Sequence, residues 1–168
     1  MGIKTRVCKA IHDKWIEQSV AVLTREGQDL IERAYEEAHT ERRTDGSKYE
    51  DGKFANDTFN LKDSYGSAVY VYGQLQKSSV RFIGSKDALD KSHSLYGRDE
   101  VDSFLTTYKA SVKRPLELVC VAAIFYASDL ERGLTPSGRK YIVISNIADD
   151  MQSLASRVKG IVKQIGNM

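Results

Sequence analysis

Three histidines, His12, His39 and His93, are the first residues to weigh for chemistry, because no other side chain titrates so close to neutral pH. None of them stands in a His-Glu-x-x-His pattern or near a cysteine at the spacing of metal ligands. His12 precedes Asp13, as in a general-base pair, but adjacent residues of a helix point in different directions. We therefore expect both side chains on a solvated face, without a catalytic role.

Carboxylates offer a second possibility, a magnesium site. Asp129 and Glu131 precede the pair Asp149-Asp150, and metal-ion catalysis would require such groups to converge on one point. The pair stands where we expect a helix to begin, and the helix dipole alone favours acids there. We expect no metal, no cofactor and no enzymatic activity. The alternative is a small hydrolase or nuclease that uses Asp129, Glu131, Asp149 or His93.

Basic residues could instead contact nucleic acid. Segment 133–140 is glycine-rich and ends in Arg139-Lys140, but it lacks the Gly-Lys-Ser/Thr ending of a phosphate loop and runs into an expected strand. The net charge is only +2, whereas phosphate binding needs a concentrated basic face. We expect no direct contact with nucleic acid. A nucleic-acid-binding accessory protein stays open as an alternative.

Several aromatic residues fall on or beside two expected strands: Tyr65, Tyr70, Tyr72 and Phe82. Such rings could stack on the bases of single-stranded nucleic acid, but aromatics on paired strands more often pack across strands or in interfaces. We therefore favour a protein interface, with these candidates: Tyr70, Tyr72, Phe82, Arg139 and Lys140.

Composition and length suit one globular domain over residues 1–168, with 41% hydrophobic and 29% charged residues. Cys8 and Cys120 form no Cys-x-x-Cys motif, so we expect two buried thiols in a reducing compartment. The N-terminus lacks the apolar core of a signal peptide, and the longest apolar run, Leu118 to Ala127, is too short to span a bilayer. We expect a soluble protein, made inside the cell, without a membrane partner.

The elements that would position these side chains begin with a helix from about Lys4 to His39. Its apolar residues recur at spacings of three and four, which is typical of an amphipathic helix: Ile3, Val7, Ile11, Trp15, Val20, Leu23, Leu30, Ile31, Ala34, Tyr35 and Ala38. Gly27 lies within this pattern, and we expect a kink or break there. A polar loop, expected to be mobile, follows over about residues 40–56.

A hairpin is predicted next. Asn60 can cap a short helical turn, and Gly66 can end it. Alternation over Ala68 to Tyr72 predicts a strand. We expect a bend over Gln74 to Ser79 and a second strand over Val80 to Ile83.

The second half of the chain predicts a middle helix, further strands and a last helix. The helix covers Asp99 to Val112 and ends before Pro115, within an insertion at about residues 86–114. The apolar run Leu116 to Phe125 suits a central strand covered on both faces, and another strand is expected over Lys140 to Ser145. Asn146 caps a C-terminal helix with an apolar seam that includes Ile147, Met151 and Leu154. The fold class is α+β: a long N-terminal helix, a small mainly antiparallel sheet with a β-hairpin, and middle and C-terminal helices packed on it.

Two motifs resemble a known family. Residues Asp57 to Ser64 are similar to the Thr-Gly-Asn-Leu-Arg-x-Ser signature of the head–tail joining, or tail-completion, proteins of long-tailed bacteriophages. The matching positions are Thr58, Asn60, Leu61 and Ser64, while Lys62 replaces arginine and Phe59 replaces glycine. Phe125 to Gly133 is similar to the family's Tyr-Ala-x-x-x-Glu-x-Gly element through Tyr126, Ala127, Glu131 and Gly133.

The resemblance implies a structural role and no catalysis. Proteins of this family form a ring in the neck of the virion, between portal-proximal proteins and the tail tube. The expected partners are other neck and tail proteins, and further copies in a cyclic homo-oligomer that can be monomeric when free. The expected location is the virion, after synthesis in the host cytoplasm.

Overall fold

The computed structural model describes residues 3–40, 54–55, 64–80, 97–123, 127–134, 143–154 and 156. The elements, in chain order, are α1 (Ile3–Ala38), β1 (His39–Thr40), β2 (Phe54–Ala55), β3 (Tyr65–Val71), β4 (Gln74–Val80), α2 (Gly97–Thr107), β5 (Glu117–Ala122), α3 (Ala127–Arg132) and the 3-10 turn η2 (Ser145–Ile147). Residues 148–154 are again helical. The predicted α+β class is confirmed.

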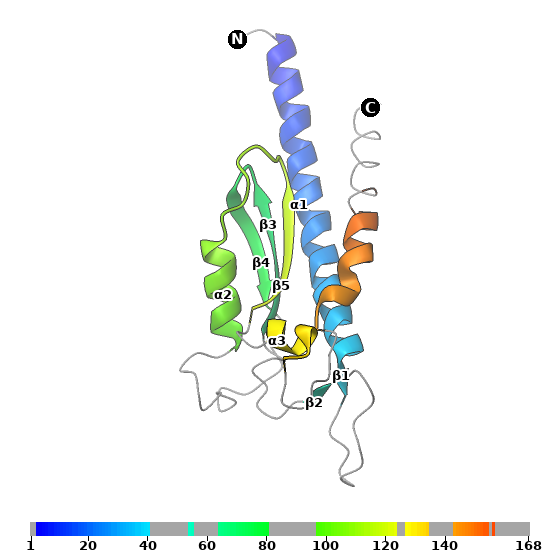
Figure 1. Ribbon diagram of the computed structural model, residues 1–168. Helices are drawn as coiled ribbons and strands as arrows, with labels where there is room; N and C mark the ends of the chain where they lie inside the picture. Colours follow the sequence, from blue (N-terminus) through cyan, green and yellow to red (C-terminus); the bar gives the residue numbers. More distant parts are fainter. Residues whose placement is uncertain are drawn as a thin grey trace.

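A three-stranded antiparallel sheet with the order β4-β3-β5 forms the centre of the fold. Helix α1 covers one face of this sheet and α2 covers the other (Figure 1). On β3, Tyr65 and Val69 belong to the core beneath α1, whereas Ala68 and Tyr70 belong to the core beneath α2. Since both faces are covered, β3 is buried from Tyr65 to Tyr70 instead of alternating between buried and exposed residues.

Among the strands that the structure describes, the central strand is therefore β3. The prediction that segment 116–125, which contains β5, is central is wrong. Residues of β5 are all half-buried, and β5 pairs with β3 alone in the described sheet. The apolar run that suggested a central position is explained by the two helices: Leu118 and Cys120 pack toward α1, and Val119 and Val121 pack toward α2.

Gly27 does not break α1, which runs from Ile3 to Ala38 as one helix. A Cβ atom at this position would lie 2.9 Å from Ser67 Oγ, 3.1 Å from Ser67 Cβ and 3.0 Å from Leu118 Cδ1. The glycine therefore permits a close approach of helix and sheet. The expected kink or break is wrong because packing against β3 and β5 outweighs the local helix propensity of about 1 kcal/mol.

The hairpin turn lies at Tyr72-Gly73, earlier than the predicted bend. Both residues have a positive φ, 46° and 81°, as a two-residue type I′ turn requires. The polar stretch that suggested the bend is instead the edge strand β4, where Gln74 to Ser78 are exposed. Polar residues fit this strand because an edge exposed to solvent gains nothing from apolar side chains.

Helix α2 ends at Thr107, before the predicted Val112, which is 72% exposed. A side-chain network shapes the connection to β5: the Tyr108 hydroxyl donates to Glu117 Oε1 (2.9 Å), and the backbone N–H of Ser111 donates to Glu117 Oε2 (3.1 Å). Arg114 lies 3.6 Å from the same carboxylate. The hydrogen bond to Glu117, together with partial burial, raises the pKa of Tyr108 and keeps the phenol a donor.

The C-terminal helical residues lie along the C-terminal half of α1 (Figure 1), where Arg33 and Asp150 form an ion pair of 2.8 Å. Ile147 and Leu154 are buried in the same core as Leu30. Asn146 does not cap this helix as predicted. It lies inside η2, which has Ile144 at the N-cap position and no side-chain cap from it.

Several predicted segments fall wholly or largely outside the described residues: the loop at about 40–56, the Asn60 turn, Arg81 to Ile83, the loop part of the insertion before Gly97, and Lys140 to Ile142. Ser145, predicted as strand, begins η2. Cys8 is exposed, against the expectation of two buried thiols, whereas Cys120 is largely buried. Among the described helices, none is both long and apolar enough to cross a bilayer.

Candidate interaction surface

Helix α1 is much longer than the sheet that it covers. Its 36 residues extend for about 54 Å at the helical rise, whereas the seven residues of β3 extend for about 23 Å. The N-terminal part of α1 therefore projects beyond the hairpin turn (Figure 1). There the predicted apolar stripe leaves the core: Ile11 is 49% exposed, whereas Leu30 and Ile31 are 2% exposed.

The hairpin turn lies beside this part of α1 and is held in place from two sides. On one side, the His12 Nε2 and Tyr72 Oη atoms are 3.1 Å apart, and the two rings stack with centroids 6.2 Å apart. On the other, a Cβ at Gly73 would lie 2.9 Å from Val112 Cγ1, so segment 110–112 packs directly over the turn. The turn thus has a defined position relative to α1.

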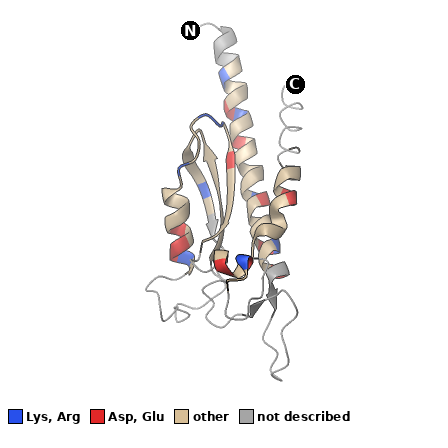
Figure 2. Cartoon of the chain, viewed as in Figure 1, with Lys and Arg blue, Asp and Glu red and all other residues tan. Residues whose placement is uncertain are grey.

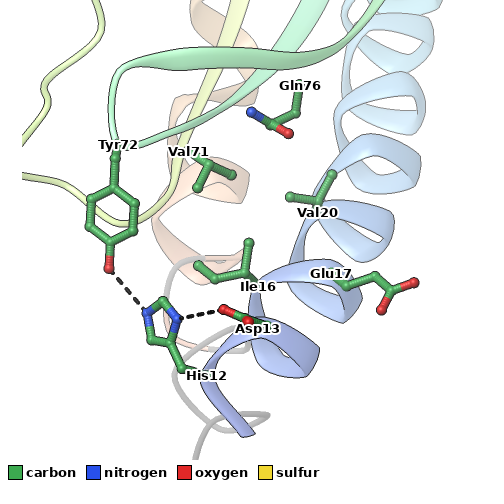
Figure 3. Close-up of a pocket in the computed structure, with 8 residues that line it drawn as sticks. All are labelled: His12, Asp13, Ile16, Glu17, Val20, Val71, Tyr72 and Gln76. Atoms are coloured by element: carbon green, nitrogen blue, oxygen red, sulfur yellow. Dashed lines mark hydrogen bonds and ion pairs between the residues drawn. The ribbon is translucent and has the colours of Figure 1, made fainter. Parts of the chain in front are cut away.

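A groove of about 480 Å³ separates α1 from the hairpin at this point (Figure 3). Its floor is aliphatic, formed by Ile16, Val20 and Val71. Its remaining lining residues are His12, Asp13, Glu17, Tyr72 and Gln76. Those five side chains are all exposed, so the groove is open along its length and suits a chain segment better than an enclosed small molecule.

The charge of the groove is negative. Asp13 and Glu17 lie four residues apart on one side of α1, and none of the described residues that line the groove is a lysine or arginine. Asp13 Oδ1 lies 3.6 Å from His12 Nδ1, with both side chains largely in solvent. The expectation that His12 and Asp13 point apart is wrong, because the exposed rotamers turn them toward each other, but the solvated position is confirmed.

Three large apolar or aromatic side chains are exposed around the same end of the molecule: Ile11 (49%), Tyr72 (44%) and Val112 (72%). We call Ile11, Tyr72, Val112 and the groove the hairpin-tip surface. Val112 packs on Gly73, next to Tyr72, so these two side chains form an apolar patch at the turn, and exposed apolar patches mark sites of protein interaction. The sequence signal for it was the continuation of the apolar stripe through Ile11, beyond what a small sheet can cover.

The predicted interface residues do not all belong to this surface. Tyr72 does, since it lines the groove. Tyr70 is only 2% exposed, and its hydroxyl donates to the Leu105 carbonyl, so its predicted place in an interface is wrong for the folded chain. Alternate residues of a strand point to opposite faces, and Tyr70 points to α2. Phe82, Arg139 and Lys140 lie outside the described residues.

The motif residues that the structure describes lie at the opposite end of the sheet. Ser64 is buried, and its carbonyl accepts the N–H of Ala123 (3.0 Å). Ala127 is buried at the start of α3. Gly133 ends α3 with a φ of 74°, which only glycine adopts without strain. Thr58, Asn60, Leu61 and Tyr126 lie outside the described residues.

Glu131 organises the chain that follows α3. Its Oε1 atom accepts the backbone N–H groups of Val143 (3.0 Å), Ile144 (2.7 Å) and Ser145 (2.9 Å). Partial burial by itself would raise the pKa of Glu131, but these hydrogen bonds together lower it below its ordinary value. Sequence reasoning found Glu131 through the motif and as a candidate carboxylate for a metal site, but did not predict that it takes the capping role expected of Asn146.

The carboxylates considered for a metal site do not form one cluster in the described part of the chain. Glu131 is occupied by backbone N–H groups, and Asp150 pairs with Arg33. Figure 2 shows acidic and basic residues scattered over the helices. Within the described ranges, no three His, Cys, Asp or Glu side chains are placed to hold a metal ion. His93 lies outside these ranges.

In comparisons with known proteins, no protein-family model, no curated protein and no solved structure matches this chain.

Proposed function

We propose that this protein is a structural component of the neck of a long-tailed bacteriophage, where it joins head and tail through protein contacts and not by catalysis. The proposal starts from the two sequence motifs, in which Ser64, Ala127, Glu131 and Gly133 match. Four elements that the resemblance implies occur in the same order among the described residues: a long helix, a strand after the first motif, a strand before the second motif, and C-terminal helical residues. Helix α2 lies within the expected insertion.

The roles of the described motif residues support a structural interpretation. Ser64 and Glu131 bind backbone groups of segments distant in sequence, and Gly133 ends a helix. These are tasks of a scaffold, and they keep the sheet and the C-terminal helical residues together.

The observation that carries the proposal is the hairpin-tip surface. The part of α1 that extends past the sheet leaves Ile11 in solvent, and at the hairpin turn Tyr72 is exposed and lines the groove. Exposing apolar area costs free energy that a partner can recover by covering it, at about 25 cal/mol per Å². The proposed partners are other neck and tail proteins and further copies of the chain in a ring.

The test uses the phage that encodes this chain, with the gene interrupted by a nonsense mutation. We expect DNA-filled heads and complete tails to accumulate unjoined, and purified protein added to the extract to restore infectious particles. The chain should also be found by mass spectrometry in purified virions, at one ring per particle. Normal joining without the protein, or its absence from virions, would refute the proposal.

A matched pair of variants links this role to the hairpin-tip surface. Ile11→Asp places a charge on the exposed stripe of α1, and Phe104→Asp places one on α2 at a similarly exposed residue. We expect Ile11→Asp to fold normally but fail to restore joining, while Phe104→Asp restores it. Equal activity of the two folded variants would show that joining does not use this surface.

A further inference from the structure

The groove between α1 and the hairpin borders a strand edge that no described strand covers. Strand β4 pairs with β3 on one side, and none of the described strands pairs with its other side. Its residues Gln74 to Ser78 are exposed, and Gln76 lines the groove. An extended segment added to β4 would therefore pass beside the groove. Its backbone would form hydrogen bonds with N–H and C=O groups on the outer side of β4.

The groove would select the side chains of such a segment. In an added strand every second residue points to the same face, so alternate side chains would project toward α1. The aliphatic floor of Ile16, Val20 and Val71 suits an apolar side chain. The Gln76 amide nitrogen donates to the Gln74 carbonyl (3.3 Å), and its amide oxygen can accept a hydrogen bond from the added segment.

The charge of the groove favours a basic ligand. The carboxylates of Asp13 and Glu17 border it, and no lysine or arginine is among its lining residues in the described part of the chain. The nearest basic residues in sequence, Lys9 and Lys14 on α1 and Lys77 on β4, do not line it. An acidic rim over an apolar floor attracts a chain with lysine or arginine beside its apolar residues and repels an acidic one.

We propose that the groove and the edge of β4 together bind an extended, basic peptide segment of a partner protein, which adds a strand to the sheet and places an apolar side chain between α1 and the hairpin. This inference rests on the proposed function, because both assume that the protein binds another protein. Its test needs no phage particle, so a failure here would leave the joining experiment standing as a separate measurement.

The experiment measures binding of labelled synthetic peptides to the full-length chain by fluorescence anisotropy. The probe alternates lysine and valine. Three control peptides replace lysine with glutamate, replace valine with glycine, or carry N-methyl groups on alternate backbone nitrogens. Of the four peptides, we expect only the probe to bind saturably. Added salt should weaken this binding, because it screens exposed charges. Equal binding of the lysine–glycine peptide would show a merely electrostatic attraction and overturn the proposal.

Variants of the protein locate the site. Asp13→Asn with Glu17→Gln should weaken binding about threefold to tenfold, as the loss of two exposed ion pairs predicts. The matched control, Asp29→Asn with Glu36→Gln, removes the same charge from exposed positions of α1 outside the groove and should bind normally. Equal affinity of the two double variants, equal binding of the N-methylated peptide, or no saturable binding up to about 1 mM would each contradict the proposal.

Discussion

Glu131 Oε1 lies 2.7 Å from the backbone nitrogen of Ile144, thirteen residues further along the chain, and accepts its hydrogen. The same oxygen receives the N–H groups of Val143 and Ser145. One carboxylate thus gathers the backbone just before the C-terminal helical residues begin. Because η2 has no side-chain cap from its own N-cap residue, this contact across the fold supplies the acceptor that a local cap would otherwise provide.

Replacing Glu131 should destabilise the protein in a pH-dependent way. Glu131→Gln should lower the free energy of unfolding by about 1–2 kcal/mol at pH 7, because charge-assisted hydrogen bonds are lost. The folded-state pKa of Glu131 is lowered from its ordinary value of 4.5, so its contribution is present above that value and is lost as pH falls through the folded pKa. Urea unfolding at a series of pH values should show the difference shrinking in acid. Asp149→Asn, at an exposed carboxylate, is the control, and a difference from wild type that is independent of pH would contradict the assignment.

Tyr70 and Tyr72 should respond differently to loss of the hydroxyl. Tyr70 donates to the carbonyl of Leu105, one of the last carbonyls of α2 that lack a partner within the helix. Tyr70→Phe should therefore cost about 1–2 kcal/mol of unfolding free energy, since a buried acceptor loses its donor. Tyr72→Phe removes an exposed contact with His12 and should change the free energy of unfolding by less than about 0.5 kcal/mol. Thermal and urea unfolding of the pair provide the measurement, and equal losses would argue against this account.

Gly27→Ala should destabilise the protein although alanine favours helices. The new Cβ would meet Ser67 Oγ at 2.9 Å and Ser67 Cβ at 3.1 Å, so helix and sheet must separate slightly. Overpacking of this kind typically costs about 1–3 kcal/mol, more than the helix propensity gained. Ser67→Gly combined with Gly27→Ala removes the opposing atoms and should recover part of the loss. A stabilised single variant in urea unfolding would show that the contact is not tight.

The two cysteines should differ in reactivity toward a thiol reagent. Cys8 is exposed, whereas burial raises the pKa of Cys120 to about 12. Because the thiolate is the nucleophile, Cys120 should be almost inert near pH 8. Titration with a coloured disulfide reagent should detect one fast thiol in the native protein and two after unfolding. Cys8→Ser should abolish the fast phase; a fast phase that persists in this variant would place Cys120 within reach of solvent.

Periodic patterns in the sequence correctly predicted the elements with a strong apolar pattern, α1 and most of β3. The apolar stripe predicted α1 within one residue at each end, and alternation predicted most of β3. Patterns of this kind are strong because burial of each apolar residue contributes in the same direction. The hairpin turn and Gly27 were misjudged, because their conformations depend on contacts with Val112, Ser67 and Leu118, which are distant along the chain.

Some features of the candidate site could likewise be predicted from the sequence, and others only from the tertiary structure. Sequence alone identified Glu131, Tyr72 and the apolar stripe of α1. Only the tertiary structure decided that Tyr70 is a core residue, that His12 meets Tyr72 and that Asp13 and Glu17 border a groove. The reason is physical: local periodicity reports which residues must leave water, but which side chains meet depends on how helix and sheet pack, and those contacts join residues such as His12 and Tyr72 that are far apart in sequence.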